Sequence, residues 1–180
     1  MKLKSNKIVS LNSSISSVTK SSDDSDDLII EGYANTTDKD RAGDVIVRSA
    51  WETKNALTNY LKNPVILAFH DHSRPVGRMI EHEVTDQGLR IKAKISKAAG
   101  EIYQLIQDEV ITAFSVGFRV LDADYDTATD IFLIKDLELH ETSVVSVPMN
   151  QTSIFSISKS FDTDEEVAEF KSLYTTNKSV

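Results

Sequence analysis

The alternation of hydrophobic and polar residues predicts that most of this chain forms β-strands. Residues 28–34, "LIIEGYA", alternate between two faces, with Ile30, Gly32 and Ala34 on one of them. The apolar run "PVILAF" at 64–69 is typical of a short buried strand. Further segments with strand character are residues 79–96, 112–126 and 130–148. The pattern therefore favours a sheet with several strands.

Turn residues show how these strands connect. Residues 79–96 predict a hairpin, because two alternating runs flank the turn sequence Asp86-Gln87-Gly88. Residues 35–46, "NTTDKDRAGDVI", predict an exposed loop that returns to a short strand. We see no internal repeat.

Three segments have helical periodicity. In residues 49–63 we expect Ser49 as N-cap, an apolar face that includes Leu57, and an end near Asn63, because Pro64 disfavours a helical residue before it. Residues 97–110 place Ile102, Leu105, Ile106 and Val110 at helical spacing. Residues 162–176 predict an acidic amphipathic helix.

The expected fold class is mainly β with a few helices (α+β), in the form of a barrel or a strongly curled sheet. Residues 12–27 are rich in Ser and Asp and predict a flexible loop or arm, because they offer little apolar surface to offset their ordering entropy. The expected organisation is an N-terminal segment (1–27), one domain (28–158) and a C-terminal tail (159–180).

Composition and charge exclude several classes of function. A length of 180 residues suits one domain with a real core. The formal net charge of −8 argues against binding to nucleic acid or to an anionic membrane surface. The chain has no cysteine, so disulfides and thiolate chemistry are excluded. It shows no apolar run of the ~20 residues of a membrane span, and its basic start lacks the apolar core of a secretory signal. We expect a soluble intracellular protein.

Candidate chemistry lies in three short islands. Residues 69–78, "FHDHSRPVGR", join two histidines to a Pro-Val-Gly sequence that predicts a chain reversal. In "AFSVGF", Ser115 shares a strand face with the small Ala113 and Gly117, an open position that a substrate or an imidazole could approach. By itself, this pattern favours close packing of a neighbouring element as the reason for the small residues.

The third island, "HETSVVSVP" at 140–148, places Glu141 and Ser143 on one strand face and His140 on the other. A carboxylate in an apolar strand needs a partner, because a buried unpaired charge is costly. By itself this pattern favours a salt bridge to a Lys or Arg.

A metal site is not predicted. His70 and His72 would share a strand face and Asp71 lies between them, but no further ligand at metal-binding spacing completes the shell. The other histidines, His82 and His140, lie in separate segments. His72 is assigned no role.

A serine hydrolase would use all three islands together. A serine needs a base to take its proton, histidine suits that task near neutral pH, and a third group orients the imidazole. Ser115 would be the nucleophile, His70 the base and Glu141 the orienting group. There is no G-x-S-x-G elbow, so an α/β-hydrolase fold is not indicated.

The order of these segments resembles the prohead maturation proteases of tailed bacteriophages, a family distantly related to herpesvirus assemblins. The matching stretches are "VILAFHDHSRPVG", "ITAFSVGF" and "ETSVVSVPMN", with "EGYANTTDKDRAGDVI" and "SAWE" before them. The resemblance covers roughly residues 28–158.

The resemblance implies a serine endopeptidase in which His70, Ser115 and Glu141 are the catalytic residues. His140 is the alternative third member, since assemblins use a second histidine there. The oxyanion donors stay open, with Gly117, Arg78 and Arg119 as candidates. The implied fold is a closed or partly open β-barrel surrounded by helices.

The implied substrates are the major capsid protein, its scaffold or delta domain, and the protease itself. The resemblance further implies action in the host cytoplasm inside the assembling prohead, a homodimer by analogy with assemblins, and no metal or cofactor. A non-enzymatic capsid or scaffold component with the same fold and a small-molecule esterase are the competing interpretations.

Overall fold

The computed structural model describes residues 15–20, 27–39 and 44–146. Its strands form one sheet in the order β1-β2-β6-β5-β4-β8-β3, and β7 pairs with β8 off this path. Neighbouring strands are antiparallel except at β3–β8 and β4–β8, which are parallel. The strands are β1 (Ile15–Lys20), β2 (Leu28–Thr36), β3 (Val45–Ile46), β4 (Val65–Ala68), β5 (Asp71–Thr85), β6 (Gly88–Ile95), β7 (Ala113–Asp126) and β8 (Ile131–Val145).

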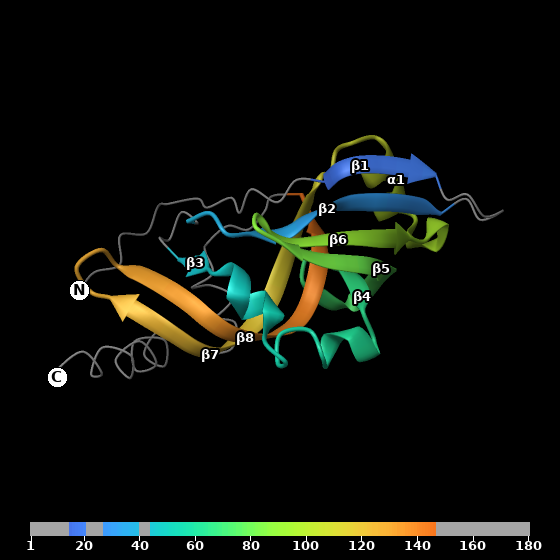
Figure 1. The fold of residues 1–180 in the computed structure, drawn as a ribbon. Coiled ribbons are helices and arrows are strands. Elements are labelled where there is room, and N and C mark those ends of the chain that lie inside the picture. Colours follow the sequence, from blue (N-terminus) through green and yellow to red (C-terminus); the bar gives the residue numbers. More distant parts are fainter. Residues whose placement is uncertain (1–14, 21–26, 40–43, 147–180) are drawn as a thin grey trace.

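The sheet is strongly curled. Figure 1 shows the β1–β2–β6–β5 layer beside the long, bent β7–β8 hairpin, and β4 joins the two by pairing with both β5 and β8. Strand β2 approaches β7 across the curl without forming a ladder with it in the described part of the chain. The mainly β prediction is confirmed, and the barrel is a partly open one.

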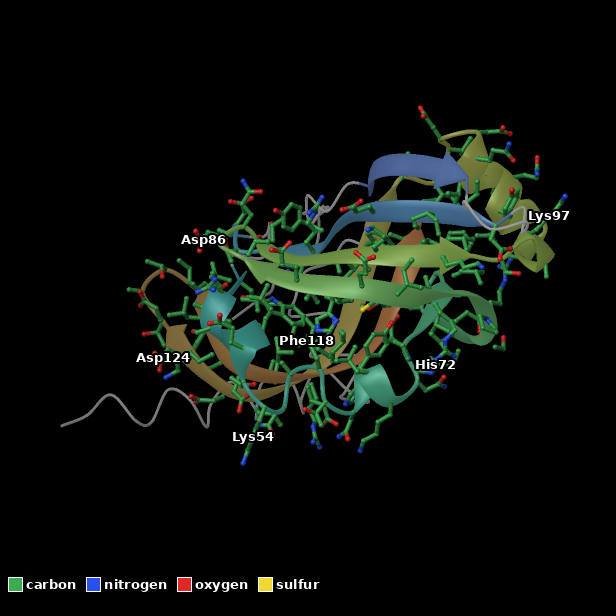
Figure 2. The ribbon with its side chains drawn as sticks, turned by 45° about the vertical axis from the view of Figure 1, so that its right-hand side comes forward. Lys54, His72, Asp86, Lys97, Phe118 and Asp124 are labelled. Carbon is green, nitrogen blue, oxygen red and sulfur yellow. The ribbon has the colours of Figure 1, made fainter. Side chains whose placement is uncertain are left out.

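The core lies inside this curl. Alternate residues of β2 are buried along Leu28–Ala34, as the sequence pattern predicted. Phe118, labelled in Figure 2, lies between the β5–β6 and β7–β8 hairpins and is almost completely buried. Trp51, Phe114 and Phe132 are also fully buried. The apolar faces of the strands therefore point toward a common interior.

Described helical structure is limited to η1 (Arg48–Glu52), η2 (Tyr60–Lys62), η3 (Lys97–Ala99) and α1 (Glu101–Gln107). A surrounding ring of helices is not confirmed by these short elements.

The prediction of one helix over 49–63 is wrong. Two 3₁₀ turns separated by irregular turns occupy this segment, and Val47, not Ser49, is the N-cap of η1. Polar side chains here bond outside the segment: Thr53 Oγ1 donates to Asp136 at 2.6 Å, and Asn55 Nδ2 donates to the same carboxylate at 2.9 Å. The Ala56 carbonyl also accepts the Leu139 N–H of β8 at 2.9 Å, so this backbone group bonds to the sheet and not within a helix, and the segment follows β8 instead.

The helix predicted at 97–110 is confirmed only in its middle. Ile102 and Ile106 are buried as expected, but the helix ends at Gln107. Glu109 is in the left-handed region at φ 57°, which stops the helix and leaves Val110 59% exposed.

The loop predicted at 12–27 is wrong for residues 15–20, and the turn predicted at Pro-Val-Gly is also wrong, whereas residues 12–14 and 21–26 lie outside the described part of the chain. Residues 15–20 form edge strand β1, because the outer edge of β2 supplies backbone partners to a segment with β-branched Ile15, Val18 and Thr19. The Pro-Val-Gly sequence lies within β5 and is no turn. Pro75 is tolerated there because the β4–β5 ladder has register shifts next to its partner Leu67.

The hairpin predicted at 79–96 is confirmed, with its turn before Gly88 at φ 135°. The C-terminal helix predicted at 162–176 lies outside the described residues.

Candidate active site

The chain reversal after β4 carries His70. Phe69 and His70 are both left-handed, at φ 57° and 60°, a conformation that costs energy for residues other than glycine. Two hydrogen bonds to β8 hold this turn. Phe69 N–H donates to the Val144 carbonyl at 3.0 Å, and His70 N–H donates to Ser143 Oγ at 3.1 Å. The turn therefore lies directly over the end of β8.

Glu141 meets His70 from β8. His70 Nδ1 lies 2.5 Å from Glu141 Oε1, and the two side chains are only 10% and 8% exposed. Glu141 Oε2 accepts a second hydrogen bond, from Ser143 Oγ at 2.6 Å. The strand pattern alone favoured a Lys or Arg as partner of this carboxylate, but its partners are a serine and His70, the histidine that the three islands together predicted.

Gly117 makes room for this carboxylate. Gly117 is paired with Glu141 across the β7–β8 ladder, and a Cβ on Gly117 would lie 2.3 Å from Glu141 Oε1. Any side chain here would displace the carboxylate from His70. The sequence predicted open space beside Gly117, and in the structure the Glu141 carboxylate occupies that space.

Ser115 lies two residues before Gly117 and therefore on the same strand face. It is paired directly with Ser143 and is buried at 4% exposure. Directly opposed residues in an antiparallel pair have Cβ atoms about 4.5–5.5 Å apart. Because Ser143 contacts both His70 and Glu141, three separate segments contribute side chains to one small buried region.

This arrangement has a definite chemical capacity. An imidazole that donates its Nδ1 proton to a carboxylate leaves Nε2 free to accept a proton. A serine hydroxyl near that nitrogen can become a nucleophile, and the carboxylate then stabilises the imidazolium.

The alternative and positioning candidates lie elsewhere. His140 is 49% exposed on the other face of β8, where its Nε2 is 3.8 Å from Glu138 Oε2. Arg119 pairs with the same Glu138 at 2.7 Å. Arg78 on β5 donates to Asn63 Oδ1 at 3.1 Å. The described contacts of these three residues do not reach the His70–Glu141 pair.

A hollow of about 220 Å³ lies on the His140 side of β8. Its lining residues are Asn59, Tyr60, Asn63, Glu138, Leu139 and His140. In that lining, Tyr60 donates its hydroxyl to the Val65 carbonyl at 2.8 Å, and burial raises its pKa to about 12. Tyr60 is therefore a neutral anchor for the start of β4.

Asp71 and His72 point outward. Figure 2 shows His72 at the outer edge of the molecule, and Asp71 Oδ1 accepts bonds from Ser73 N–H at 2.9 Å and Ser73 Oγ at 2.6 Å. The Ser73 hydroxyl holds the pKa of Asp71 below its usual value. Among the described residues, no group of three or more His, Asp or Glu side chains could hold a metal ion.

Sequence reasoning missed two features of the site. It placed Ser143 on the same face as Glu141 but assigned it no role, although the i, i+2 spacing was a usable signal. It also missed the left-handed conformation of Phe69 and His70, for which the residue types gave no signal.

A buried histidine–carboxylate pair, with a serine on the same strand face as the carboxylate, supplies the groups that a serine hydrolase uses. A model of the caudovirus prohead serine protease family matches residues 16–167. The chain belongs to this family.

Two curated relatives agree with that membership. The chain is 54% identical to the prohead protease of Escherichia phage T5 over 147 residues, which cover 81% of this chain and 70% of the relative. It is 25% identical over 155 residues to the capsid polyprotein of Pseudomonas phage PAJU2, covering 81% of this chain and 22% of that protein.

The fold is similar to that of the bacteriophage T4 capsid assembly protease, gp21. The TM-score is 0.59 at 10% identity, with 77% of this chain and 96% of the other covered. A likeness at this identity supports the fold alone. The relation to herpesvirus assemblins stays a prediction. In the described residues, no helix combines the length and apolarity needed to cross a bilayer.

Proposed function

We propose that this chain is a serine endopeptidase that cleaves capsid and scaffold proteins, and itself, during prohead maturation in the host cytoplasm. Ser115 is the nucleophile, His70 the general base and Glu141 the group that orients His70. The observation that carries the proposal is the 2.5 Å contact between His70 Nδ1 and Glu141 Oε1, on the strand face that also bears Ser115.

Each residue has a defined part in the reaction. Ser115 Oγ attacks the scissile carbonyl carbon while its proton passes to His70 Nε2. His70 then gives that proton to the leaving amine, which releases the first product and leaves an acyl-enzyme. A water molecule, deprotonated in the same way, hydrolyses the acyl-enzyme and restores Ser115. Glu141 keeps the Nδ1 proton on His70 and stabilises the imidazolium.

The relatives support the proposed substrates. One is named a prohead protease, and the other, in which a related sequence makes up about a fifth of the chain, is named a capsid polyprotein. Family membership favours the same setting for this chain. The proposed chemistry uses side chains and water, and needs no cofactor. Self-association as a homodimer is part of the proposal.

The test is co-expression with the major capsid protein of the same phage, comparing wild type with Ser115→Ala by intact mass. We expect trimming of the capsid protein and of this chain in wild type, and neither in Ser115→Ala. Ser73→Ala, which removes an exposed hydroxyl near the start of β5, is the matched control and should retain both cleavages.

Other outcomes separate the competing functions. Capsid processing that continues with Ser115→Ala would support a non-enzymatic assembly component. Turnover of simple esters by the purified chain, with the capsid protein left intact, would support an esterase.

A further inference from the structure

Ser143 occupies the centre of the site, yet the reaction above gives it no part. Its hydroxyl oxygen accepts the His70 backbone N–H at 3.1 Å, and its proton is donated to Glu141 Oε2 at 2.6 Å. The residue is 0% exposed. One hydroxyl thus contacts both members of the His–Glu pair.

These bonds exclude Ser143 as a second nucleophile. A serine hydroxyl has a single proton, and Ser143 gives it to a carboxylate oxygen, so no proton is available to the imidazole. Its fully buried oxygen is also closed to a peptide substrate. Ser115, across the ladder, has neither of these bonds among the described contacts.

The two hydrogen bonds of Ser143 restrain the backbone of His70 and the rotation of the Glu141 carboxylate. His70 is left-handed next to another left-handed residue, and such a turn persists only when its surroundings hold it. The bond from His70 N–H to Ser143 provides that restraint. The bond to Glu141 Oε2 fixes the rotation of the carboxylate, so that Oε1 faces His70 Nδ1.

We propose that Ser143 is a positioning residue that sets the geometry of the His70–Glu141 pair. This inference rests on the proposed function, in which that pair activates Ser115. Because the hydroxyl must donate and accept at once, alanine cannot replace it, whereas threonine retains the required group. Ser143 pairs with Leu67 of β4, three residues before His70, so the same ladder places hydroxyl and turn together.

The experiment compares wild type, Ser143→Ala and Ser143→Thr as full chains. The probe is a fluorophosphonate, which reacts with an activated serine without a protein substrate, and the labelling rate and labelled residue are read by mass spectrometry. We expect Ser115 to be labelled, about 10²-fold more slowly in Ser143→Ala, because small misplacements of catalytic groups have effects of that size. Ser143→Thr should recover most of the rate.

A second measurement does not depend on activity. Proton NMR of the His70 ring should show a slowly exchanging Nδ1–H signal in wild type that is lost or broadened in Ser143→Ala. The control is Thr142→Val, which removes an equally buried hydroxyl from the opposite face of β8. It should leave both the labelling rate and the NMR signal unchanged.

The outcomes separate the two levels of the argument. Labelling of Ser115 at an unchanged rate in a folded Ser143→Ala, with the ring signal intact, overturns the positioning role and leaves the proposed function standing. Absence of labelling at Ser115 in wild type, or labelling at Ser143, overturns the proposed function. The NMR comparison still decides the positioning role in that case.

Discussion

The two ends of the β7–β8 hairpin handle polar residues in opposite ways. At the end near the chain reversal, Ser115, Glu141 and Ser143 are all buried. At the far end, Lys135 reaches Asp122 and Asp124 at 3.5 and 3.2 Å, all on exposed side chains. One hairpin thus contains an enclosed polar cluster and an open one.

The difference comes from what covers each end. The near end is paired with β4 and covered by the Phe69–His70 turn, and its ladder is regular from Ala113 to Gly117. Among the described strands, the far end of β8 pairs with the two-residue β3, and its ladder with β7 has three register shifts after Gly117. Polar groups in an enclosed region are restrained and interact strongly, whereas exposed ion pairs are screened by water. The enclosed end is therefore where we expect chemistry.

The largest effect is expected for Glu141→Gln, which tests directly whether the enclosed end of the hairpin carries the chemistry. The amide keeps the shape but has no charge and can present its NH₂ to Nδ1, which leaves the imidazole proton on the wrong nitrogen, so we expect labelling of Ser115 to fall by roughly 10⁴-fold. The matched control is His140→Gln, one residue earlier on the exposed face of the same strand. If His140→Gln shows the larger loss, the assignment of Glu141 as third member is wrong.

A smaller loss is expected for Gly117→Ala. The added Cβ would lie 2.3 Å from Glu141 Oε1 and must push the carboxylate away from His70. We expect about a 10²-fold lower labelling rate, together with an overpacking cost of about 1–3 kcal/mol in the free energy of unfolding.

Gly100→Ala is the control for Gly117→Ala, since Gly100 has open space around its Cβ position but a left-handed φ of 59°. It should lower stability in a urea titration and leave the labelling rate unchanged. If Gly100→Ala and Gly117→Ala lower the labelling rate equally, the loss comes from general destabilisation of the fold. Displacement of the Glu141 carboxylate would then not be its cause.

The smallest effect is expected for Asn59→Ala, which changes the face of β8 opposite Glu141. A hydrogen bond from Asn59, with the nearby charge of Arg119, holds the pKa of Glu138 below its usual value. This carboxylate therefore stabilises the fold above its unfolded pKa, and that contribution is lost as pH falls through the lower folded pKa. Asn59→Ala should raise the pKa of Glu138 in an NMR titration and remove part of this acid-sensitive stability.

Activity of Asn59→Ala at neutral pH should equal that of wild type, because Glu138 lies on the other face of β8 from Glu141. A large loss of labelling in this variant would show that the two faces of the strand are coupled, and would weaken the contrast drawn above.

The prediction of the site depended on strand alternation and on motif order. Alternation separated Glu141 from His140 and placed Ser115 beside Gly117, and the structure has these residues on the faces expected. The strand pattern alone favoured a Lys or Arg as the partner of Glu141, whereas the three islands taken together predicted His70, which is the partner in the structure although it is 71 residues away in sequence. Local pattern shows that a carboxylate is buried, but it does not identify the group that meets it.

By itself, the sequence determined most of the segments that form strands, which side of those strands faces the core, and which residue types could act together. These properties follow from local periodicity, because successive residues of a strand point to opposite faces whatever their neighbours are. Local periodicity of this kind predicted three features: the strand at 28–34, the hairpin at 79–96 and the strand that carries Ser115.

Only the tertiary structure decided the rest. The Phe69–His70 turn is left-handed because two bonds to β8 hold it there, and β1 is a strand because β2 offers it an edge. Residues 48–62 form two 3₁₀ turns and no single helix because β8 binds the Ala56 carbonyl and the side chains of Thr53 and Asn55. Each of these outcomes depends on a partner far away in the chain. Long-range hydrogen bonds and pairings outweigh local preferences of about 1 kcal/mol per residue, so a local pattern cannot predict them.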